Sequence, residues 1–493
     1  MRYKNILWDW NGTLIDDAVT SLECVNDMLY EMNKPLISLE DYYTYVETPI
    51  IGFYKHILTE DELDFPKISK SFHSSYNEKL NKTFLADGAK DVLRRLNQLG
   101  AHQYIITATK EESARSLIID YNINDYFDGI FGADNTFAES KVERAKHFFK
   151  EYNINPVETV FIGDTLHDLE TANALGIDCI LVTYGHQGEK ITNNSGVTTA
   201  NNLNEVFQII IDDRAVDFHT HSTCSDGTFT PTELIKHAKS VGLSAIALTD
   251  HDTVDGIEEA IKASKAEEIE FIPGIEFSVT AETEIHIIGL FVDHKNAELL
   301  ATIDKTRSQR RKRMEEICRK LREHGFDITY EEALSLAGGD FVGRAHIAHL
   351  MVKKGYAETV REVFDKYIGL NKPCYAVKKE ITPEDAIKAI RSAGGLAFLA
   401  HLHQTKFSED KLDLLLSQLK AYGLNGIEGY YTEYTNDHIV TFRKLAQKHG
   451  LFYSGGSDFH GTMKPDVQLK SGYSDLHIPY TVLTTLKRLK SEI

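Results

Sequence analysis

The chain has 493 residues and a formal net charge of −20 at pH 7. This size predicts two or more domains, and the charge argues against long nucleic acid as a partner, because binding without sequence preference requires a basic surface. The five cysteines include no CxxC pair, the N-terminus shows no signal-peptide segment, and no apolar run is long enough to cross a bilayer, so we expect a cytoplasmic protein with no membrane partner.

The first half of the sequence alternates short apolar strands with helices. The predicted strands are residues 5–8, 104–107, 159–162 and 179–182, and helical patterns such as 89–99 and 142–152 lie between them. This alternation predicts a doubly wound α/β domain over about residues 1–212. A mostly helical segment at about 16–84 interrupts the alternation after the first strand, and we interpret it as an inserted cap.

The second half starts a new series of strands and helices at about residue 213. Predicted strands lie at 215–219, 245–248, 270–272 and 286–290, and then, after a helical stretch, at 396–400, 426–429 and 451–454. Repeated strand–helix units of this kind predict a barrel-like α/β domain over 213–493, with a helical insertion at about 300–390.

Chemically active side chains follow the strands of the first half. Asp9 follows the first strand, Thr107 ends the second, Lys141 opens a helix, and Asp164 and Asp168 follow the third. The carboxyl ends of parallel strands meet in one crevice, so we expect these side chains to lie together. Asp9 and Asp164 are suited to share a Mg²⁺ ion, which prefers oxygen ligands.

These motifs, in this order, resemble the haloacid dehalogenase (HAD) superfamily over about residues 1–210. The resemblance implies a Rossmann-like core, a helical cap over the site and a Mg²⁺ cofactor. It also implies that Asp9 is the nucleophile, that Lys141 neutralises phosphate charge, and that Asp164 and Asp168 bind the metal. The family's hydroxyl residue falls on Thr107, with Thr109 as the alternative.

Asn11 departs from the pattern of the family's phosphatases, which have Asp at this position. That Asp gives its backbone carbonyl to Mg²⁺ and protonates the leaving group. Asn11 keeps the first role and loses the second, and such acid–base help contributes about 10²–10⁴-fold to rate. Two interpretations stay open: a specialised phosphatase that favours acyl or aryl phosphates, and a weak or degenerate site.

In the second half, histidines and acids recur at one predicted strand end after another. They are His219, His221, Asp226, His251, Glu276, His286, His401, Asp458 and His460. A single histidine on a strand is usually not a ligand, but a series of this kind is not explained that way. Imidazole combined with carboxylate suits Mn²⁺, Zn²⁺ or Fe²⁺, with several ions close together.

The motifs HxH, SDG, TDHDT, GIE and SDFH resemble the PHP (polymerase and histidinol phosphatase) superfamily over about 214–493. The resemblance implies a distorted (β/α)7 barrel with a trinuclear metal centre that activates water for attack on phosphorus. The implied ligand sets are, for the first metal, His219, His221, Glu276 and Asp458; for the second, Glu276, His286 and His401; for the third, Asp226, His251 and His460. Asp250 and Asp252 are interpreted as groups that orient imidazoles.

The segment 343–348, GRAHIA, resembles a GRPHIA segment of PHP members that remove the 3′-phosphate of nucleoside 3′,5′-bisphosphates and trim short RNA from its 5′ end. It makes Arg344 and His346 candidates for substrate binding, since arginine grips phosphate with paired hydrogen bonds. The basic stretch at 305–320 is interpreted as a solvated helix face, with an oligonucleotide track as the alternative.

The sequence therefore predicts a phosphoric monoester hydrolase whose barrel acts on small nucleotides, other small phosphorylated metabolites or short oligoribonucleotides, joined to a Mg²⁺-dependent phosphatase of altered potency. A further hypothesis is that the two sites act in series on one nucleotide. The alternative makes histidinol phosphate, or another phosphomonoester, the substrate of the barrel and the first domain a non-catalytic phosphate-binding regulator.

Overall fold

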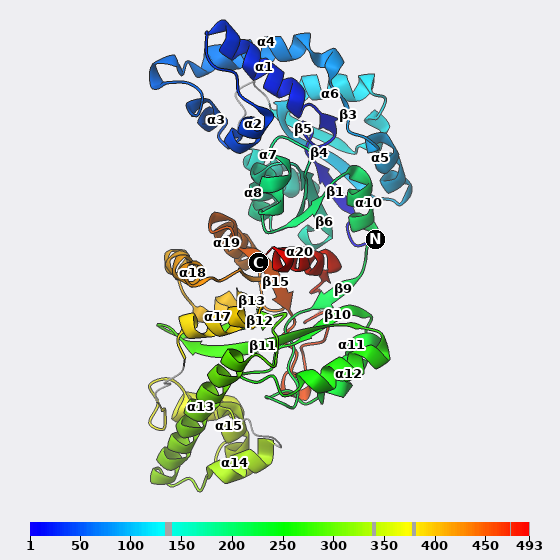
Figure 1. The fold of residues 1–493 in the computed structure, drawn as a ribbon. Coiled ribbons are helices and arrows are strands. Elements are labelled where there is room, and N and C mark those ends of the chain that lie inside the picture. Colours follow the sequence, from blue (N-terminus) through cyan, green and yellow to red (C-terminus); the bar gives the residue numbers. More distant parts are fainter. Residues whose placement is uncertain (134–140, 338–341, 377–380, 474, 493) are drawn as a thin grey trace. The chain divides into compact units, whose positions relative to one another are not determined.

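The computed structural model describes residues 1–133, 141–337, 342–376, 381–473 and 475–492 (Figure 1). The chain divides into two compact units, Met1–Asp213 with Asn436–Gly450, and Arg214–Thr435 with Leu451–Ile493. The first unit thus includes helix α19 (Asn436–Lys448), which lies between two strands of the second unit in sequence. None of the helices among the described residues is both long and apolar enough to span a bilayer.

The first unit is built on a parallel sheet with the strand order β5-β4-β1-β6-β7-β8. Its strands are β1 (Asn5–Trp8), β4 (His102–Lys110), β5 (Gly129–Ala133), β6 (Thr159–Gly163), β7 (Asp178–Val182) and β8 (Thr198–Ala200). The connecting helices are α5 (Ala89–Gln98), α6 (Glu111–Asp120), α7 (Lys141–Tyr152), α8 (Leu166–Leu175), α9 (Gly188–Asn193) and α10 (Leu203–Ile211). The central position of β1 brings the ends of β1, β4 and β6 together.

A helical cap interrupts this unit between β2 (Ile15–Asp16) and β3 (Phe84–Leu85), which pair antiparallel at its base. Its helices are α1 (Ala18–Glu31), α2 (Leu39–Tyr45), α3 (Ile51–Lys55) and α4 (Phe65–Glu78). They bury a small apolar core of their own, which includes Val25, Leu29 and Phe53. The cap therefore packs around its own core and is joined to the sheet through the β2–β3 pair.

The second unit is a curled eight-stranded sheet with the order β15-β14-β13-β12-β11-β10-β9-β16. Its strands are β9 (Ala215–Asp217), β10 (Leu243–Leu248), β11 (Glu270–Thr280), β12 (Glu284–Leu290), β13 (Leu396–Leu399), β14 (Gly426–Tyr431), β15 (Phe452–Gly456) and β16 (Ile478–Pro479). The sheet closes on itself, because Phe218 N donates to Gly455 O at 3.0 Å and Asp458 N donates to His219 O at 2.9 Å. The predicted class, a doubly wound α/β core followed by an α/β barrel, is confirmed.

One strand differs from a simple strand–helix repeat. β12 runs antiparallel to both β11 and β13. The connection from β11 to β12 spans only residues 281–283, and a parallel neighbour requires a crossover of about a dozen residues or more. A hairpin is the arrangement that so short a connection permits.

Helices surround the barrel strands, and a group of further helices is inserted after β12. The surrounding helices in this unit are α11 (Pro231–Ser240), α12 (Ile257–Glu267), α17 (Pro383–Ser392), α18 (Glu409–Tyr422) and α20 (Tyr480–Ser491). The inserted helices are α13 (Ala297–Glu323), α14 (Tyr330–Ala337), α15 (Arg344–Lys353) and α16 (Val360–Val363). Figure 1 shows α13 leading away from the sheet towards α14 and α15, and these helices share a separate apolar core that includes Met314, Ile347 and Met351.

Candidate functional site

The centre of the barrel site is Glu276, a fully buried carboxylate on β11. Its Oε2 lies 3.3 Å from His219 Nε2 and 3.4 Å from His221 Nε2. Asp458 Oδ1 lies 3.4 Å and 3.2 Å from the same two nitrogens. A tetrahedral metal ion with bonds of about 2.0–2.1 Å holds its ligand atoms about 3.3 Å apart. The spacing of these oxygens and nitrogens therefore suits a shared metal.

The two oxygens of Glu276 face different groups of histidines. Oε1 lies 2.8 Å from His286 Nδ1 and 3.1 Å from His401 Nε2. His251 Nδ1 lies 2.9 Å from Oε2, on the side of the first group. The carboxylate is therefore placed to bridge neighbouring cations, as the resemblance implies.

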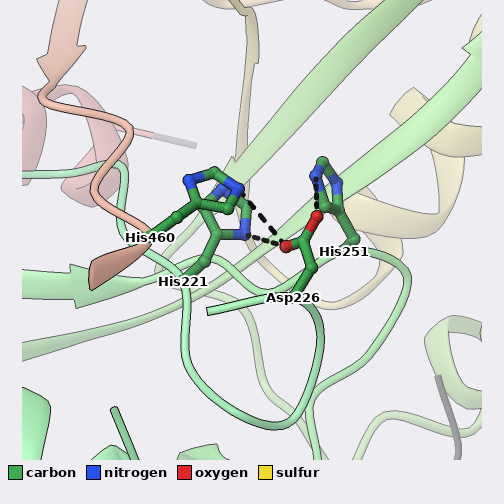
Figure 2. Close-up of side chains that lie close together, drawn as sticks. All are labelled: His221, Asp226, His251 and His460. Atoms are coloured by element: carbon green, nitrogen blue, oxygen red, sulfur yellow. Dashed lines mark ion pairs between the residues drawn. The ribbon is translucent and has the colours of Figure 1, made fainter. Parts of the chain in front are cut away.

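A third group forms around Asp226 (Figure 2). One carboxylate oxygen lies 3.3 Å from His460 Nε2 and 3.8 Å from His221 Nδ1, and the other lies 3.8 Å from His251 Nε2. Figure 2 shows the carboxylate of Asp226 between His251 on one side and His221 and His460 on the other. With this group, every ligand predicted in the second half of the sequence lies in one cluster.

Buried polar atoms that lack a hydrogen bond show whether the cluster is suited to bind metal ions. His219 Nε2, His221 Nε2 and Glu276 Oε2 are buried and make no hydrogen bond among the residues that the structure describes. Buried polar atoms are nearly always satisfied, and leaving one unsatisfied costs about 1–3 kcal/mol. Divalent cations would satisfy all three atoms at once, so the donor set fits such ions.

The pKa values in the cluster move in opposite directions. Burial lowers the pKa of His221 to about 3, assisted by the nearby His460 and His251. Burial would raise the pKa of Asp226, but His460 and His251 hold it well below its usual range. Burial would also lower the pKa of His219, but the carboxylates of Glu276, Glu428 and Asp458 raise it well above its usual value.

Glu428 on β14 positions two of the histidines. His219 Nδ1 donates to Glu428 Oε1 at 2.9 Å, and the backbone N of His401 donates to Oε2 at 2.6 Å. The first bond fixes the imidazole so that Nε2 faces Glu276 and Asp458. Sequence reasoning identified only a strand here, although an acid inside an apolar strand was a signal for a buried partner.

Asp250 and Asp252 have partners other than the expected imidazoles. Asp250 accepts from the backbone N and hydroxyl of Ser222 at 2.7 and 2.6 Å, and from the Ser225 hydroxyl at 2.6 Å. Asp252 accepts from Ser278 N at 3.1 Å and pairs with Arg310. These acids therefore hold the ligand-bearing loops and an arginine of helix α13.

A pocket is lined by the predicted metal ligands Asp226, His251 and His286, and also by Arg310, Arg344 and His346. The guanidinium of Arg344 lies 5.5 Å from the centre of the Phe364 ring. His346 Nδ1 accepts from Gly343 N at 3.1 Å, which leaves Nε2 as the protonated nitrogen. Both predicted substrate-binding residues therefore line the pocket.

Arg310 was not singled out from the sequence, because it lies within the basic stretch 305–320. Other cations of that stretch form pairs along the helix surface, such as Arg311 with Glu315 at 2.8 Å and Arg319 with Glu316 at 2.6 Å. The tertiary structure separates Arg310 from them by directing it to the pocket and to buried Asp252.

The first unit brings its predicted acids together around Lys141. Lys141 Nζ lies 2.8 Å from Asp9 Oδ1 and 2.7 Å from Asp168 Oδ1. The other Asp168 oxygen accepts from Asp164 N at 3.1 Å and from Thr165 N at 3.0 Å, which caps helix α8. Ligand oxygens of the three aspartates lie within 4.8 Å of one another. Burial raises the pKa of Asp9 to about 7 and that of Asp164 to about 6, so the acids suit a divalent cation.

The two threonines considered for phosphate binding have different neighbours. Thr107 is buried, and its hydroxyl accepts from Thr109 N at 3.1 Å. The Thr109 hydroxyl donates to Asn11 Oδ1. Thr109 is thereby engaged with the side chain of Asn11, which is consistent with Thr107 as the phosphate-binding residue.

Asn11 has a network of its own that the sequence did not reveal. Its Nδ2 donates to Asp17 Oδ2 at 2.6 Å and to the Tyr76 hydroxyl at 3.0 Å. Asp17 also faces His186 Nε2 at 3.2 Å, and this contact with Asp17, against the effect of burial, raises the pKa of His186 to about 9. Tyr76 and His186 come from parts of the chain distant from Asn11, and neither they nor Asp17 stand in one of the motifs.

Comparison with known families matches both halves of the chain. A family model described as haloacid dehalogenase-like hydrolase matches residues 6–182, and one described as PHP domain matches residues 217–373.

Similar proteins match the second half. A 5′-3′ exoribonuclease from Haemophilus influenzae is 36% identical over 245 residues, covering 50% of this chain and 89% of that protein. A 3′,5′-nucleoside bisphosphate phosphatase from Chromobacterium violaceum is 34% identical over 247 residues, covering 50% of this chain and 87% of that protein. A solved structure of a putative metal-dependent phosphoesterase from Bifidobacterium adolescentis matches with a TM-score of 0.50 and 29% identity, covering 56% of this chain and 96% of that one.

Proposed function

Because the chain belongs to the PHP family and also has a haloacid dehalogenase-like domain, we propose that its barrel removes the 3′-phosphate of nucleoside 3′,5′-bisphosphates. Release of nucleotides from the 5′ end of short oligoribonucleotides is the second candidate activity of the same site, favoured by the exoribonuclease relative. The first domain is proposed as a Mg²⁺-dependent phosphatase of altered potency.

The observation that carries the barrel proposal is a pocket lined by both predicted metal ligands and arginines. Asp226 and His251 line it together with Arg310 and Arg344. Bound divalent ions, Mn²⁺ or alternatively Zn²⁺ or Fe²⁺, supply activation of water and stabilisation of charge at phosphorus. The arginines would hold a second phosphate of the same substrate, because guanidinium groups bind phosphate with paired hydrogen bonds.

His346 completes the proposed recognition of the substrate. Its Nδ1 accepts from Gly343 N, so Nε2 carries the proton, and we infer that this N–H donates to a phosphate or sugar oxygen of the substrate. Burial lowers the pKa of His346, which keeps the ring neutral near pH 7. The charge that attracts the second phosphate therefore comes from the arginines, and His346 contributes a directional hydrogen bond.

The first domain is proposed to bind phosphate and Mg²⁺ at Asp9, Asp164 and the backbone carbonyl of Asn11. Lys141 lies against Asp9 and would balance phosphate charge. Asn11 carries no acidic proton, so esters whose leaving groups need protonation are expected to react slowly. The competing proposal, phosphate binding without turnover, rests on the same residue.

Incubation with adenosine 3′,5′-bisphosphate, Mn²⁺ and Mg²⁺ tests the barrel proposal, with the products separated by chromatography. We expect AMP from the full-length chain and none from His221→Ala. Arg344→Ala should lower kcat/KM by about 10–100-fold through loss of a charge-assisted contact. Arg361→Ala is the matched control, because Arg361 lies exposed on α16.

Three outcomes of this assay decide between the alternatives. Faster release of phosphate from histidinol phosphate than from the bisphosphate would refute the nucleotide assignment. Conversion of AMP onward to adenosine, lost in Asp9→Asn, would support the two sites acting in series. Adenosine that persists in Asp9→Asn would exclude the first domain as its source.

A further inference from the structure

The side chain of Asn11 joins three segments of the first unit. The residue lies in the loop after β1, two positions from Asp9. Its amide nitrogen donates to Asp17 and to Tyr76 of cap helix α4, at 2.6 and 3.0 Å, and its carbonyl oxygen accepts from the Thr109 hydroxyl. The side chain thus uses both donors and an acceptor to link the loop, the cap and β4.

Asp17 lies at the base of the cap, directly after β2 and before α1. It is 1% exposed, so its contacts are shielded from water. Besides the bond from Asn11, its carboxylate accepts from the Tyr76 hydroxyl at 2.6 Å and from Gly12 N at 2.8 Å, and it lies 3.2 Å from His186 Nε2. Asn11, Asp17 and the Tyr76 hydroxyl therefore form a closed triangle of hydrogen bonds at the hinge of the cap.

We propose that Asn11 is a positioning residue, matched to Asp17, that latches cap helix α4 to the loop carrying Asp9. This latch holds the cap whether or not the site turns over a substrate. Asn11 therefore has a role of its own, beyond the loss of the acid that the family's phosphatases have at this position.

The chemistry of the triangle explains why an amide and not a carboxylate stands at position 11. Asp17 presents only acceptors when ionised, and two of its neighbours, Gly12 N and Tyr76 OH, already donate to it. An Asp at position 11 would place carboxylate oxygens against those of Asp17, where Asn11 now donates at 2.6 Å. Two facing acceptors lose the hydrogen bond and repel each other, and the Tyr76 hydroxyl loses its donor.

The arrangement predicts that exchanging the two side chains preserves the latch. With a carboxylate at position 11 and an amide at position 17, an amide still faces a carboxylate across the same gap. After the exchange, the amide at position 17 keeps a carbonyl oxygen for Gly12 N and His186 Nε2, and the carboxylate at position 11 keeps acceptors for Thr109 and Tyr76. A residue with a purely space-filling role would not be rescued by this exchange.

Hydrogen exchange measured by mass spectrometry on the full-length chain tests the latch through peptides covering α4. We expect Tyr76→Phe and Asn11→Asp each to speed exchange of α4 by about fivefold, the equivalent of one net hydrogen bond. The double variant Asn11→Asp/Asp17→Asn should return to within about twofold of the parent. Tyr30→Phe is the matched control, because Tyr30 is an exposed tyrosine of the same cap.

Several results would overturn the inference. Parental exchange of α4 in Tyr76→Phe, or in Asn11→Asp, would show that the triangle does not hold the cap. Equal exchange in the double variant and in Asn11→Asp would show that position 11 is not matched to Asp17. If Asn11→Asp does not fold, as judged by circular dichroism, folding of the double variant supports the match and its failure to fold contradicts it.

Discussion

At the scale of single residues, two predicted histidine ligands of the barrel are held by a carboxylate outside the predicted ligand set. Glu428 is the clearest case, since it accepts from the ring of His219 and from the backbone of His401. A histidine bound by both ring nitrogens has a fixed tautomer and a fixed direction, which raises its affinity for a metal. The side chains that orient the ligands are therefore as important to the site as the ligands.

Replacing Glu428 by Gln tests this dependence. The amide keeps the size of the side chain but can turn its NH₂ group towards His219, which disfavours the tautomer that leaves Nε2 for a metal. We expect Glu428→Gln to weaken metal binding by about 10–100-fold. Metal content after dialysis against graded chelator measures the change, and Glu358→Gln, at an exposed position, should match the parent. Parental metal retention in Glu428→Gln would contradict the assigned role.

In the first unit, Lys141 is the residue that holds the predicted acids in place, because it is buried between Asp9 and Asp168. Replacing it by Gln leaves buried carboxylates without their cation, which typically costs about 3–5 kcal/mol. We expect Lys141→Gln to lower the unfolding temperature seen by calorimetry, and Mg²⁺ to recover part of the loss. Lys146→Gln on the same helix should change little, since its pair with Glu143 is exposed. Equal effects of the two substitutions would refute this argument.

At the scale of elements, the helical insertion of the barrel has a core separate from the metal site. Helices α13 and α15 bury Met314, Ile347 and Met351 against one another, and the same helices carry Arg310 and Arg344 to the pocket. The packing of the insertion therefore sets the distance between the arginines and the predicted metal ligands, without contributing a ligand.

Met351→Ala tests whether this packing controls substrate recognition. Truncating a buried methionine costs about 2–5 kcal/mol locally and should loosen α15. We expect KM for adenosine 3′,5′-bisphosphate to rise, while kcat/KM for p-nitrophenyl phosphate, which has no second phosphate, changes less. Lys353→Ala, at an exposed position of α15, is the control. A parallel loss on both substrates would instead assign the insertion a role in the metal site.

At the scale of the whole molecule, both units have potential metal ligands among their described residues, and the chemistry of these ligands differs between the units. The first unit offers aspartate oxygens, which suit Mg²⁺, and the second combines imidazole with carboxylate, which suits Mn²⁺, Zn²⁺ or Fe²⁺. A ligand stabilises only the unit that binds it, so the two kinds of ion should act on different unfolding transitions.

Differential scanning calorimetry of metal-free protein measures this separation. An ion present at 100 times its dissociation constant stabilises the folded state by about 2.7 kcal/mol. We expect His219→Ala to remove the stabilisation by Mn²⁺ and keep that by Mg²⁺, and Asp164→Asn to do the reverse. Loss of both effects in either variant would show that the two sites are not independent.

The PHP family, the resemblance to haloacid dehalogenase-like hydrolases, the fold classes and the residues proposed as ligands could be predicted from the sequence. These features are local in the chain: a carboxylate or histidine at or just after the end of an apolar strand, as at Asp9 and His219, marks a strand end, and parallel strand ends must meet. The antiparallel direction of β12 was not predicted, because a short apolar run has the same sequence pattern in a parallel and in an antiparallel strand.

The partners of those residues were decided only by the tertiary structure. Glu428 lies 209 residues from His219, and Tyr76 lies 65 residues from Asn11, so no spacing in the sequence links them. Arg310 and Arg313 resemble their basic neighbours in sequence, and only the tertiary structure shows that they line the pocket. Hydrogen bonds and charges act over a few ångströms, and which distant side chains come that close is determined when the strands and helices pack.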